Sequence, residues 1–343
     1  MMKTIASVLL AGAVLAFGAG TAMADGELHI DNYGDYTNPE LIKKFSETYN
    51  VKVTLDTYDA SEDMYAKVKQ GGSGYDVVVP ASFLVPAMVA DGLLAKIEPN
   101  QMSNFKYMRP EFVNVYWDDG RHYSVPWQWG TTGPAVNTEF YKGDINTWAV
   151  IFNPPAELKG RVNVEPGMTD VLNAASYYLG QDACSDKKED LKKLNDTLIE
   201  AKKSWRTMDY DTIGKMTSKD AYATLTWDGA AIRSRLQVPS IKYAFPKEGL
   251  ESWMDNVVVL KDAKNMENAK LFINFIMDPQ NAALISAFAH YDNGIIGTEQ
   301  YLPKEMQGAP ELTVPAGVKT EFLKPCSQEV ATVHAKIWNN LMK

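Results

Sequence analysis

Residues 246–249 read Pro-Lys-Glu-Gly, and residues 253–255 read Trp-Met-Asp, just before the apolar run 257–260. Alternate residues of a β-strand point to one face, so Trp253 and Asp255 are expected to look into the same space. An indole face and a carboxylate together attract an organic cation, through cation–π and Coulomb forces. The alternative interpretation is a buried tryptophan beside an aspartate that caps a turn or forms a salt bridge.

Around this stretch, strand-like and helix-like segments alternate along the chain, which indicates an α/β fold with mainly parallel sheets. Apolar residues at helical spacing mark the helices, and buried or alternating apolar runs mark the strands. Strands are expected at 27–31, 51–55, 75–80, 135–137, 223–227 and 243–246. Helices are expected to start at Pro39 and Pro279 and to cover 61–68, 82–94, 170–179, 186–203, 268–277 and 327–342, with a surface loop at 304–314.

The chain is predicted to form two lobes. Its 343 residues exceed the usual size of one domain and can bury two sizeable cores. The stretch 123–133, rich in aromatics, Gly and Pro, is interpreted as a first crossing into a second lobe, and the segment after Trp253 as the return. The expected boundaries are residues 25–132 and 256–299 for lobe 1, and 133–255 and 300–343 for lobe 2.

Residues 1–24 have the features of a secretory signal peptide: Lys3 near the start, a short apolar core and an Ala-Met-Ala end. The core is too short to span a membrane. Cleavage after Ala24 would export the chain, most simply to a bacterial periplasm. Loss of Lys3 changes the net charge from −9 to −10. That charge disfavours nucleic acid or an anionic membrane surface as partner and fits a cationic ligand weakly.

The chain contains two cysteines, Cys184 and Cys326. An oxidising compartment favours a disulfide between them, and two separate buried thiols are the alternative. Because the closed loop would be long, the chain-entropy model gives a stabilisation of roughly 4–5 kcal/mol.

The order of these segments resembles the spermidine/putrescine-binding periplasmic proteins of ABC importers. The resemblance runs from about Leu28 to the C-terminus and rests on short markers in a shared order. The markers are Asn-Tyr-Gly-Asp-Tyr at 32–36, Met-Tyr-Ala-Lys at 64–67, Tyr-Asp-Val-Val-Val-Pro at 75–80, Val-Pro-x-x-Trp-Gly at 125–130, the two stretches at 246–249 and 253–255, and Ile-Asn-Phe at 273–275. The resemblance implies a ligand cleft between two α/β lobes that closes by hinge motion, and a membrane permease as partner. We further expect a monomer without a cofactor.

The resemblance also implies a set of ligand-binding residues: Tyr33, Asp35, Tyr36, Ser82, Phe83, Asp170, Trp227, Trp253 and Asp255. In this set Asp255 is the principal amine-binding carboxylate, and Asp170 lies near the other end of the ligand. The chain departs from the family pattern at 81–83, where Ala-Ser-Phe replaces Ser-x-Tyr, and at Gly167, which stands in place of an acid. We therefore expect a less polar cleft with one carboxylate fewer than a spermidine site.

Physical chemistry supports a cationic ligand for such a cleft. An alkyl amine is charged at neutral pH, and its burial requires a carboxylate partner. One carboxylate contact contributes roughly 4 kcal/mol before desolvation, a desolvated indole roughly 2 kcal/mol, and each buried CH₂ about 0.8 kcal/mol. Micromolar affinity requires about 8 kcal/mol net. Carboxylates at both ends, Asp255 and Asp170, would suit a diamine or short polyamine.

Two other functions stay open. The same fold could bind a small zwitterion, such as an amino acid or 4-aminobutyrate, if Arg233 or Arg235 enters the cleft. An exported hydrolase could use paired acids such as Asp35 and Asp255. The chain has no nucleophile elbow, metal-spaced His/Cys cluster or Walker loop, so we expect a binding protein rather than an enzyme. The sequence leaves open whether three more side chains face the cleft: Trp127, Trp129 and Asp228.

Overall fold

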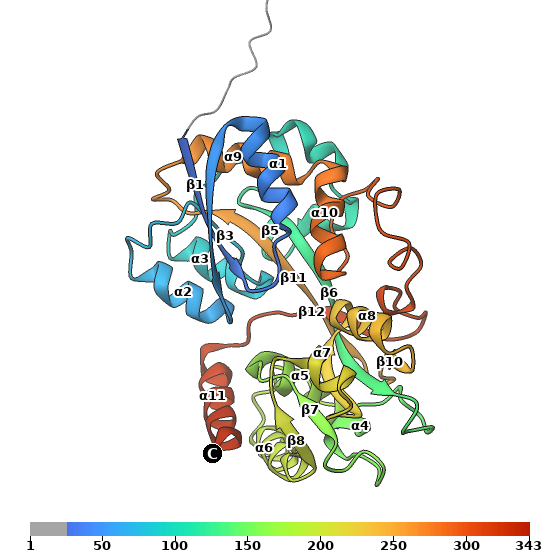
Figure 1. The fold of residues 1–343 in the computed structure, drawn as a ribbon. Coiled ribbons are helices and arrows are strands. Elements are labelled where there is room, and N and C mark those ends of the chain that lie inside the picture. The colour runs from blue at the N-terminus through green and yellow to red at the C-terminus, as the bar shows by residue number, and fades with distance from the viewer. Residues whose placement is uncertain (1–25) are drawn as a thin grey trace, which may run out of the picture.

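The computed structural model describes residues 26–343, which form two α/β lobes joined by strands that pass between them (Figure 1). The predicted signal peptide, residues 1–24, lies outside the described residues. One hydrophobic core includes Phe45 and Phe272, and a second, separate core includes Trp148. The two-lobed α/β architecture predicted from the sequence is therefore confirmed. No helix in the described range is long and apolar enough to cross a membrane.

Lobe 1 contains a group of parallel strands flanked by helices. Its elements are β1 (Gly26–Tyr33), α1 (Pro39–Tyr49), β2 (Val51–Tyr58), α2 (Ser61–Lys69), β3 (Val77–Val78), α3 (Val85–Ala90), β4 (Asn114–Val115), β5 (Asp118–Asp119), α9 (Met266–Ile276) and α10 (Pro279–Ala289). Strand β1 lies between β2 and β3, and both pairs are parallel. Helix α1 starts as predicted: the Asn38 side chain accepts the Glu40 N–H, and Pro39 is the first helical residue.

Lobe 2 repeats this plan around a second parallel group. Its elements are α4 (Ala149–Phe152), β7 (Val162–Val164), α5 (Met168–Leu179), α6 (Lys188–Lys202), β8 (Trp205–Met208), α7 (Thr212–Thr217), β9 (Ala223–Trp227), α8 (Asp228–Gln237), β10 (Ile241–Tyr243) and α11 (Gln328–Met342). Strand β7 pairs in parallel with β8 and β9. Each lobe therefore has a group of parallel strands, as the strand–helix alternation predicted, and antiparallel pairs extend both groups.

Two long strands, β6 (Ser124–Asn137) and β11 (Leu250–Val259), pass side by side from one lobe to the other (Figure 1). They pair antiparallel and join both strand groups into one sheet of order β2-β1-β3-β11-β6-β9-β7-β8. Strand β6 contributes Val125 to the lobe 1 core and Val136 to the lobe 2 core. Strand β11 likewise contributes Leu250 to lobe 2 and Met254 to lobe 1. A third, short strand at the junction, β12 (Thr320–Phe322), pairs with β11.

Three predicted elements differ in extent from the structure. The helix expected at 82–94 is a 3₁₀ turn, Ser82–Leu84, followed by α3, which ends at Ala90. Gly92 takes a φ of +69°, and the Leu93 N–H bonds back to the Met88 carbonyl, so the chain closes the helix there. The strand expected at 243–246 is β10 at Ile241–Tyr243, and the buried run 75–80 pairs as a strand only at Val77–Val78.

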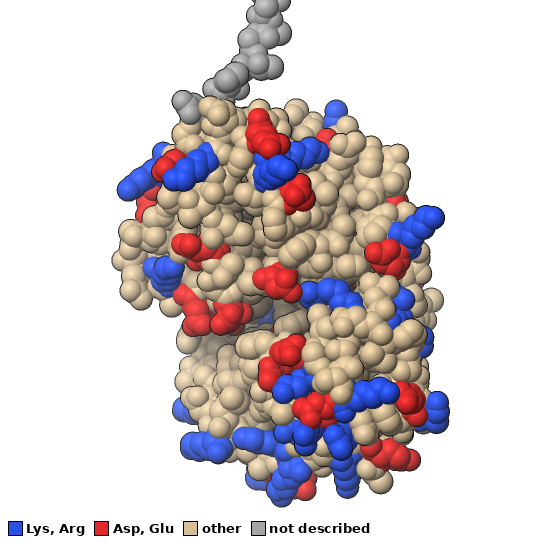
Figure 2. All heavy atoms as spheres, in the orientation of Figure 1, with Lys and Arg blue, Asp and Glu red and all other residues tan. Residues whose placement is uncertain are grey.

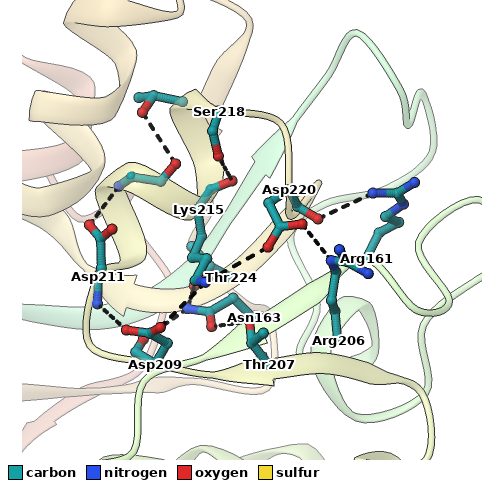
Figure 3. A network of polar contacts seen from close by, with 12 residues as sticks. Arg161, Asn163, Arg206, Thr207, Asp209, Asp211, Lys215, Ser218, Asp220 and Thr224 are labelled. Carbon is teal, nitrogen blue, oxygen red and sulfur yellow. Dashed lines mark hydrogen bonds and ion pairs between the residues drawn. The ribbon is translucent and has the colours of Figure 1, made fainter.

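A polar network fixes the edge of lobe 2 around β7 (Figure 3). The Asn163 side chain of β7 donates to the Asp209 carbonyl at 3.0 Å and accepts from the Thr207 hydroxyl at 2.7 Å. Lys215 of α7 lies 3.4 Å from the Asp209 carboxylate. Glu165 follows directly after β7 in the sequence.

The predicted disulfide between Cys184 and Cys326 is confirmed. The two Cα atoms are 5.2 Å apart and are separated by 142 positions in the sequence. Cys184 lies between α5 and α6, and Cys326 directly precedes α11, which buries Ile337 and Leu341 in the lobe 2 core. The disulfide thus ties the final segment of the chain to lobe 2.

Replacing both cysteines by alanine should lower the free energy of unfolding by about 2–5 kcal/mol, because the unfolded chain regains the freedom of a long loop. Urea denaturation of wild type and of the Cys184→Ala, Cys326→Ala variant measures this difference. As a control, a reductant should shift the midpoint of the wild type but not that of the variant. Equal midpoints for the oxidised wild type and the variant would contradict the expected stabilisation.

Candidate functional site

The candidate site is built on one face of β11. Glu251, Trp253 and Asp255 alternate along this strand, so their side chains share a face. All ten residues of β11 are buried, because neighbouring strands and helices cover both sides. Asp255 lies opposite Ala81 in an isolated antiparallel bridge and opposite Gln128 in the β6 pairing. The carboxylate therefore stands where the strands cross between the lobes.

Asp255 is buried without a cationic partner. The residue is 8 % exposed, and its Oδ2 accepts a hydrogen bond from the Tyr36 hydroxyl at 2.8 Å. Desolvation raises the pKa of Asp255 to about 7; Asp170 adds to the rise, and hydrogen bonds from Tyr36 and Tyr33 oppose it. Within residues 26–343, Asp255 forms no ion pair with Lys, Arg or His.

Aromatic rings form a continuous wall beside this carboxylate. Ring centroids are 4.7 Å apart for Tyr58 and Tyr33, 5.6 Å for Tyr33 and Tyr36, 5.8 Å for Tyr36 and Tyr291, and 5.0 Å for Tyr291 and Trp253. The Trp253 indole N–H is buried and has no hydrogen-bond partner. A carboxylate among electron-rich rings is a combination that attracts an organic cation. We call these five rings, with Asp255, the aromatic cage.

Lobe 2 brings three carboxyl groups together: Glu165 after β7, Asp170 on α5 and Glu251 on β11. We call them the carboxyl trio. Asp170 accepts the Thr132 hydroxyl at 2.8 Å, and Glu251 accepts the Asn173 side-chain amide at 2.8 Å. The other oxygen of Glu251 and one oxygen of Glu165 are buried without a hydrogen-bond partner. The described ion pairs include none of the three, so the trio also lacks a cation.

Burial raises the pKa of Glu165 and of Glu251 well above the usual range, and Asp170 raises both further. Glu165 and Glu251 therefore keep their protons to a higher pH than exposed glutamates do. A Cβ on Gly167 would lie 2.7 Å from Glu165 Oε2 and 2.8 Å from Asp170 Oδ2, so the carboxyls converge at this glycine.

The expectation of one carboxylate fewer than in a spermidine site considered position 167 alone. Gly167 carries no acid, but Glu165 and Glu251 place two more carboxyls beside Asp170. Sequence reasoning missed both. Glu251 could have been found from its place two residues before Trp253, and Glu165 from its place at the carboxyl end of a parallel strand, where α/β proteins bind ligands.

The structure brings four of the predicted site residues together in the aromatic cage: Tyr33, Tyr36, Trp253 and Asp255. Asp170 approaches from lobe 2, close enough to raise the pKa of Asp255. Trp227, at the start of α8, is half-buried and packs against the lobe 1 core.

Asp35, Ser82 and Phe83 lie apart from this group. The Asp35 side chain is 76 % exposed and forms an ion pair with Arg233 of α8 at 2.9 Å, which links the loop after β1 to lobe 2. Ser82 is buried with no partner for its hydroxyl, and Phe83 is half-buried in the same 3₁₀ turn. In the described residues, no hydrogen bond or ring contact joins Phe83 to the cage.

Asp228 lies at the start of α8 and not on the face of a strand. It is buried, and its oxygens accept the backbone N–H groups of Thr131 and Gly229, each at 2.7 Å. Burial nevertheless raises the pKa of Asp228 to about 8. A Cβ on Gly130 would lie 2.6 Å from Asp228 and 2.7 Å from the Trp253 ring, so Asp228 lies directly behind the cage.

Three other side chains left open by the sequence have partners of their own. Trp127 is buried in the lobe 1 core. The Trp129 indole donates to the Asn293 carbonyl at 3.1 Å. Arg235 makes two hydrogen bonds with the buried Glu311 carboxylate, the longer at 3.0 Å.

Figure 2 shows a hollow between the lobes, with acidic side chains on the rim of the upper lobe and Lys and Arg gathered mainly on the lower lobe, away from it. Burial raises the pKa of Glu62 of α2, and Asp170 adds to the rise; burial, Glu165 and Asp170 likewise raise the pKa of Tyr210, so both side chains lie near the trio. No group of His, Cys, Asp and Glu within residues 26–343 could hold a metal ion. The chemistry available here is therefore that of carboxyls and aromatic rings.

A family model for bacterial extracellular solute-binding proteins matches residues 40–314. The chain belongs to this family. The family is one of substrate-binding transport proteins and is not an enzyme family.

Three relatives illustrate the extent of the match. The putrescine-binding periplasmic protein SpuD of Pseudomonas aeruginosa (strain UCBPP-PA14) is 29 % identical, over 85 % of this solute-binding protein and 84 % of its own length. The spermidine/putrescine-binding periplasmic protein of Escherichia coli (strain K12) is 28 % identical, over 89 % and 88 %. The solved spermidine/putrescine ABC transporter substrate-binding protein PotD of Streptococcus pneumoniae superposes with a TM-score of 0.79 at 26 % identity, over 93 % and 99 %.

Asp255→Asn should stabilise the unliganded solute-binding protein at pH 8 but not at pH 4. The pKa of Asp255 is about 7 in the folded protein, against its ordinary value of 3.8. Wild type therefore loses stability as the pH rises from about 4 to 7, since the unfolded chain releases this proton more readily. At about 1.4 kcal/mol per pKa unit, the gain at pH 8 is on the order of 4 kcal/mol.

Thermal unfolding at the two pH values measures this effect. Asp262→Asn, which removes an exposed carboxylate in the turn after β11, is the matched control and should change little at either pH. The same change in melting temperature for Asp255→Asn at pH 4 and pH 8 would rule out a strained ionised carboxylate at this position.

Proposed function

We propose that this solute-binding protein is the periplasmic receptor of an ABC importer and binds a polyamine or related organic cation between its lobes. The observation that carries the proposal is a buried carboxylate, Asp255, among aromatic rings, with the carboxyl trio nearby and no cationic side chain paired to any of the four acids. Buried carboxylates without a partner are costly, and a bound ammonium group supplies the missing charge.

Approximate free energies show what the charged contact and the apolar contacts each contribute to binding. A carboxylate–ammonium contact contributes roughly 4 kcal/mol at an effective dielectric near 20, and desolvating the ammonium removes several kcal/mol of it. Aromatic contact adds up to about 2 kcal/mol, and each buried methylene about 0.8 kcal/mol. The carboxyls therefore select for a cation, and the rings and methylenes supply most of the net affinity.

The relatives support the same ligand class. The Pseudomonas and Escherichia proteins are named for binding putrescine and spermidine, and the Streptococcus protein is named as the substrate-binding part of an ABC transporter. With the predicted signal peptide at residues 1–24, these names support export to the periplasm and delivery to a membrane permease. In this proposal the chain acts as a monomer by binding and release, without chemical turnover.

The proposed roles follow the two ends of the cleft. Asp255 holds one ammonium group, with Tyr33, Tyr36 and Trp253 around it. Asp170 faces the other end of the ligand, and Trp227 covers the middle from the lobe 2 side.

The remaining proposed site residues act at the edges. Ser82 and Phe83 border the cage through their position beside Ala81, whose strand partner is Asp255. Asp35 acts in closure through its ion pair with Arg233. The bodies that close are lobe 1, residues 25–132 and 256–299, and lobe 2, residues 133–255 and 300–343.

A small zwitterion is the second candidate, favoured by two donors without acceptors. The Trp253 Nε1–H and the Arg233 Nε–H are buried and unpartnered, and Arg233 lies close enough to Tyr291 to affect its pKa. Both could receive a ligand carboxylate, as in 4-aminobutyrate. Against this candidate, Arg233 is already neutralised by Asp35.

Isothermal titration calorimetry with putrescine, spermidine, agmatine and 4-aminobutyrate tests the ligand class. We expect at least one of the amines to bind with micromolar affinity or better, and Asp255→Asn to weaken it by about 100-fold or more, because one partner of a buried charge pair is lost. Asp262→Asn should bind like wild type. Absence of heat with every amine at high micromolar concentration would refute an organic-cation receptor.

The same calorimetry with Asp170→Ala separates the two candidates. An elongated diamine anchored at both ends should lose about 10-fold or more in affinity, since a charged contact disappears. A zwitterion anchored by Asp255 and Arg233 should keep its affinity. Tighter binding of 4-aminobutyrate than of any diamine, unaffected by this substitution, would favour the second candidate.

Asp35→Asn should weaken binding by no more than about fivefold, because an exposed ion pair contributes only about 0–1 kcal/mol. We expect the change in the dissociation rate, since the pair with Arg233 joins the lobes of the closed form. Stopped-flow release of ligand, compared between Asp35→Asn and Asp262→Asn, measures it. A loss as large as that of Asp255→Asn would mean that Asp35 contacts the ligand directly.

A further inference from the structure

The two ends of the proposed cleft differ in chemistry. At the lobe 1 end, a single carboxylate, Asp255, lies among five aromatic rings. At the lobe 2 end, Glu165 and Asp170 converge beside Gly167 and Glu251 lies near Asp170; the hydrogen-bond partners of the three are a backbone N–H, a hydroxyl and a side-chain amide. An aromatic face attracts any cation, with or without N–H groups, whereas carboxyl oxygens gain most from N–H donors.

Two members of the trio have unused hydrogen-bond acceptors. Glu165 and Glu251 are 0 % and 2 % exposed, and each keeps one oxygen without a partner. Unsatisfied polar atoms at this depth are uncommon in folded proteins and call for a partner. A primary ammonium group carries three N–H donors and can serve three converging acceptors at once.

The groups around the trio leave its charge uncompensated. Titratable side chains interact with it from several elements: Asp255 on β11, Glu62 on α2, Tyr177 on α5, Tyr210 after β8 and Tyr243 on β10. All of them are acids or tyrosines, so they do not favour ionisation of the buried carboxyls of Glu165 and Glu251.

We propose that Glu165, Asp170 and Glu251 form a second ammonium subsite, which takes an N–H-bearing primary amine end of the ligand and releases a proton when it fills. The inference rests on the proposed function and adds the chemistry of its second end. In the free protein Glu165 or Glu251, both buried, carries a proton. When the ammonium group enters, one carboxyl O–H bond breaks, the proton passes to solvent, and the ammonium charge replaces it.

Two consequences distinguish this subsite from the cage. The trio should reject a trimethylammonium group, which has no N–H, whereas the cage should accept one through its rings. Binding should also release more protons in wild type than in a protein that lacks one of the three carboxyls. Asp255 contributes to proton release in every case, so the difference between variants is the relevant quantity.

Calorimetry on the full mature chain tests both consequences. The probes are putrescine, 4-aminobutyl-trimethylammonium and butane-1,4-bis(trimethylammonium), each titrated at pH 7 in two buffers of different ionisation enthalpy. We expect the first two to bind within about tenfold of each other and the third at least about 100-fold more weakly, because the trio loses every charged hydrogen bond. Glu251→Gln and, independently, Glu165→Gln should release fewer protons with putrescine than wild type. The control variant Asp262→Asn should release the same number as wild type.

Different results would overturn the ammonium subsite and the proposed function. Binding of the bis(trimethylammonium) compound as tight as that of putrescine, or equal proton release by wild type and both Gln variants, overturns the subsite while leaving the amine receptor intact. No binding of any of these cations or of spermidine by wild type overturns the proposed function, and the subsite with it. Two independent variants keep the result decisive if one of them does not fold.

Discussion

The hydrogen bond from the Tyr36 hydroxyl to the Asp255 carboxylate, 2.8 Å long, connects the parts of the structure on which the site depends. Tyr36 belongs to the loop between β1 and α1, and Asp255 to the strand that crosses between lobes. That loop is held by Asn38, which caps α1 and donates to the Leu284 carbonyl of α10. Since α10 leads directly to Tyr291, one set of contacts fixes the carboxylate and the rings on both sides of it.

The carboxyls that would bind a cation lower the stability of the unliganded protein. Three buried carboxyls without cations cost free energy in the unliganded protein, and burial raises the pKa of all three, Asp255, Glu165 and Glu251. Two full hydrophobic cores and a disulfide in lobe 2 offset that cost. A cation that neutralises these groups removes part of the penalty, so ligand binding and stability are coupled through the same carboxyls.

The sequence was sufficient for the fold because the signals for it are local. Strand–helix alternation, the Asn38–Pro39 helix start and the two cysteines each predict a feature that the structure contains. Failures occurred where distant residues decide the outcome. β6 runs for 14 residues through a stretch rich in Gly, Pro and aromatics, because β11 and β9 pair with it from both lobes.

From local sequence, the site could be predicted only on the face of β11 that carries Trp253 and Asp255. Trp253 and Asp255 are two residues apart, so their shared direction follows from strand geometry alone. Asp35 lies one residue before Tyr36 but turns outward, at a φ of +52°, to pair with an arginine about 200 positions away. The approach of Glu165 and of Glu251 to Asp170 depends equally on long-range packing, since the three lie on different elements that meet only in the folded protein.

Gly167 shows how a departure from a family pattern can mislead when it is read one position at a time. Its φ of −79° is open to any residue, so backbone freedom does not require glycine here. The limited space favours glycine instead, because a Cβ would lie 2.7 Å from the Glu165 carboxylate and 2.8 Å from that of Asp170. An acid at position 167 and the present place of Glu165 are therefore mutually exclusive. The glycine makes room for a carboxyl supplied from the end of β7, so negative charge at this end of the cleft is relocated rather than lost.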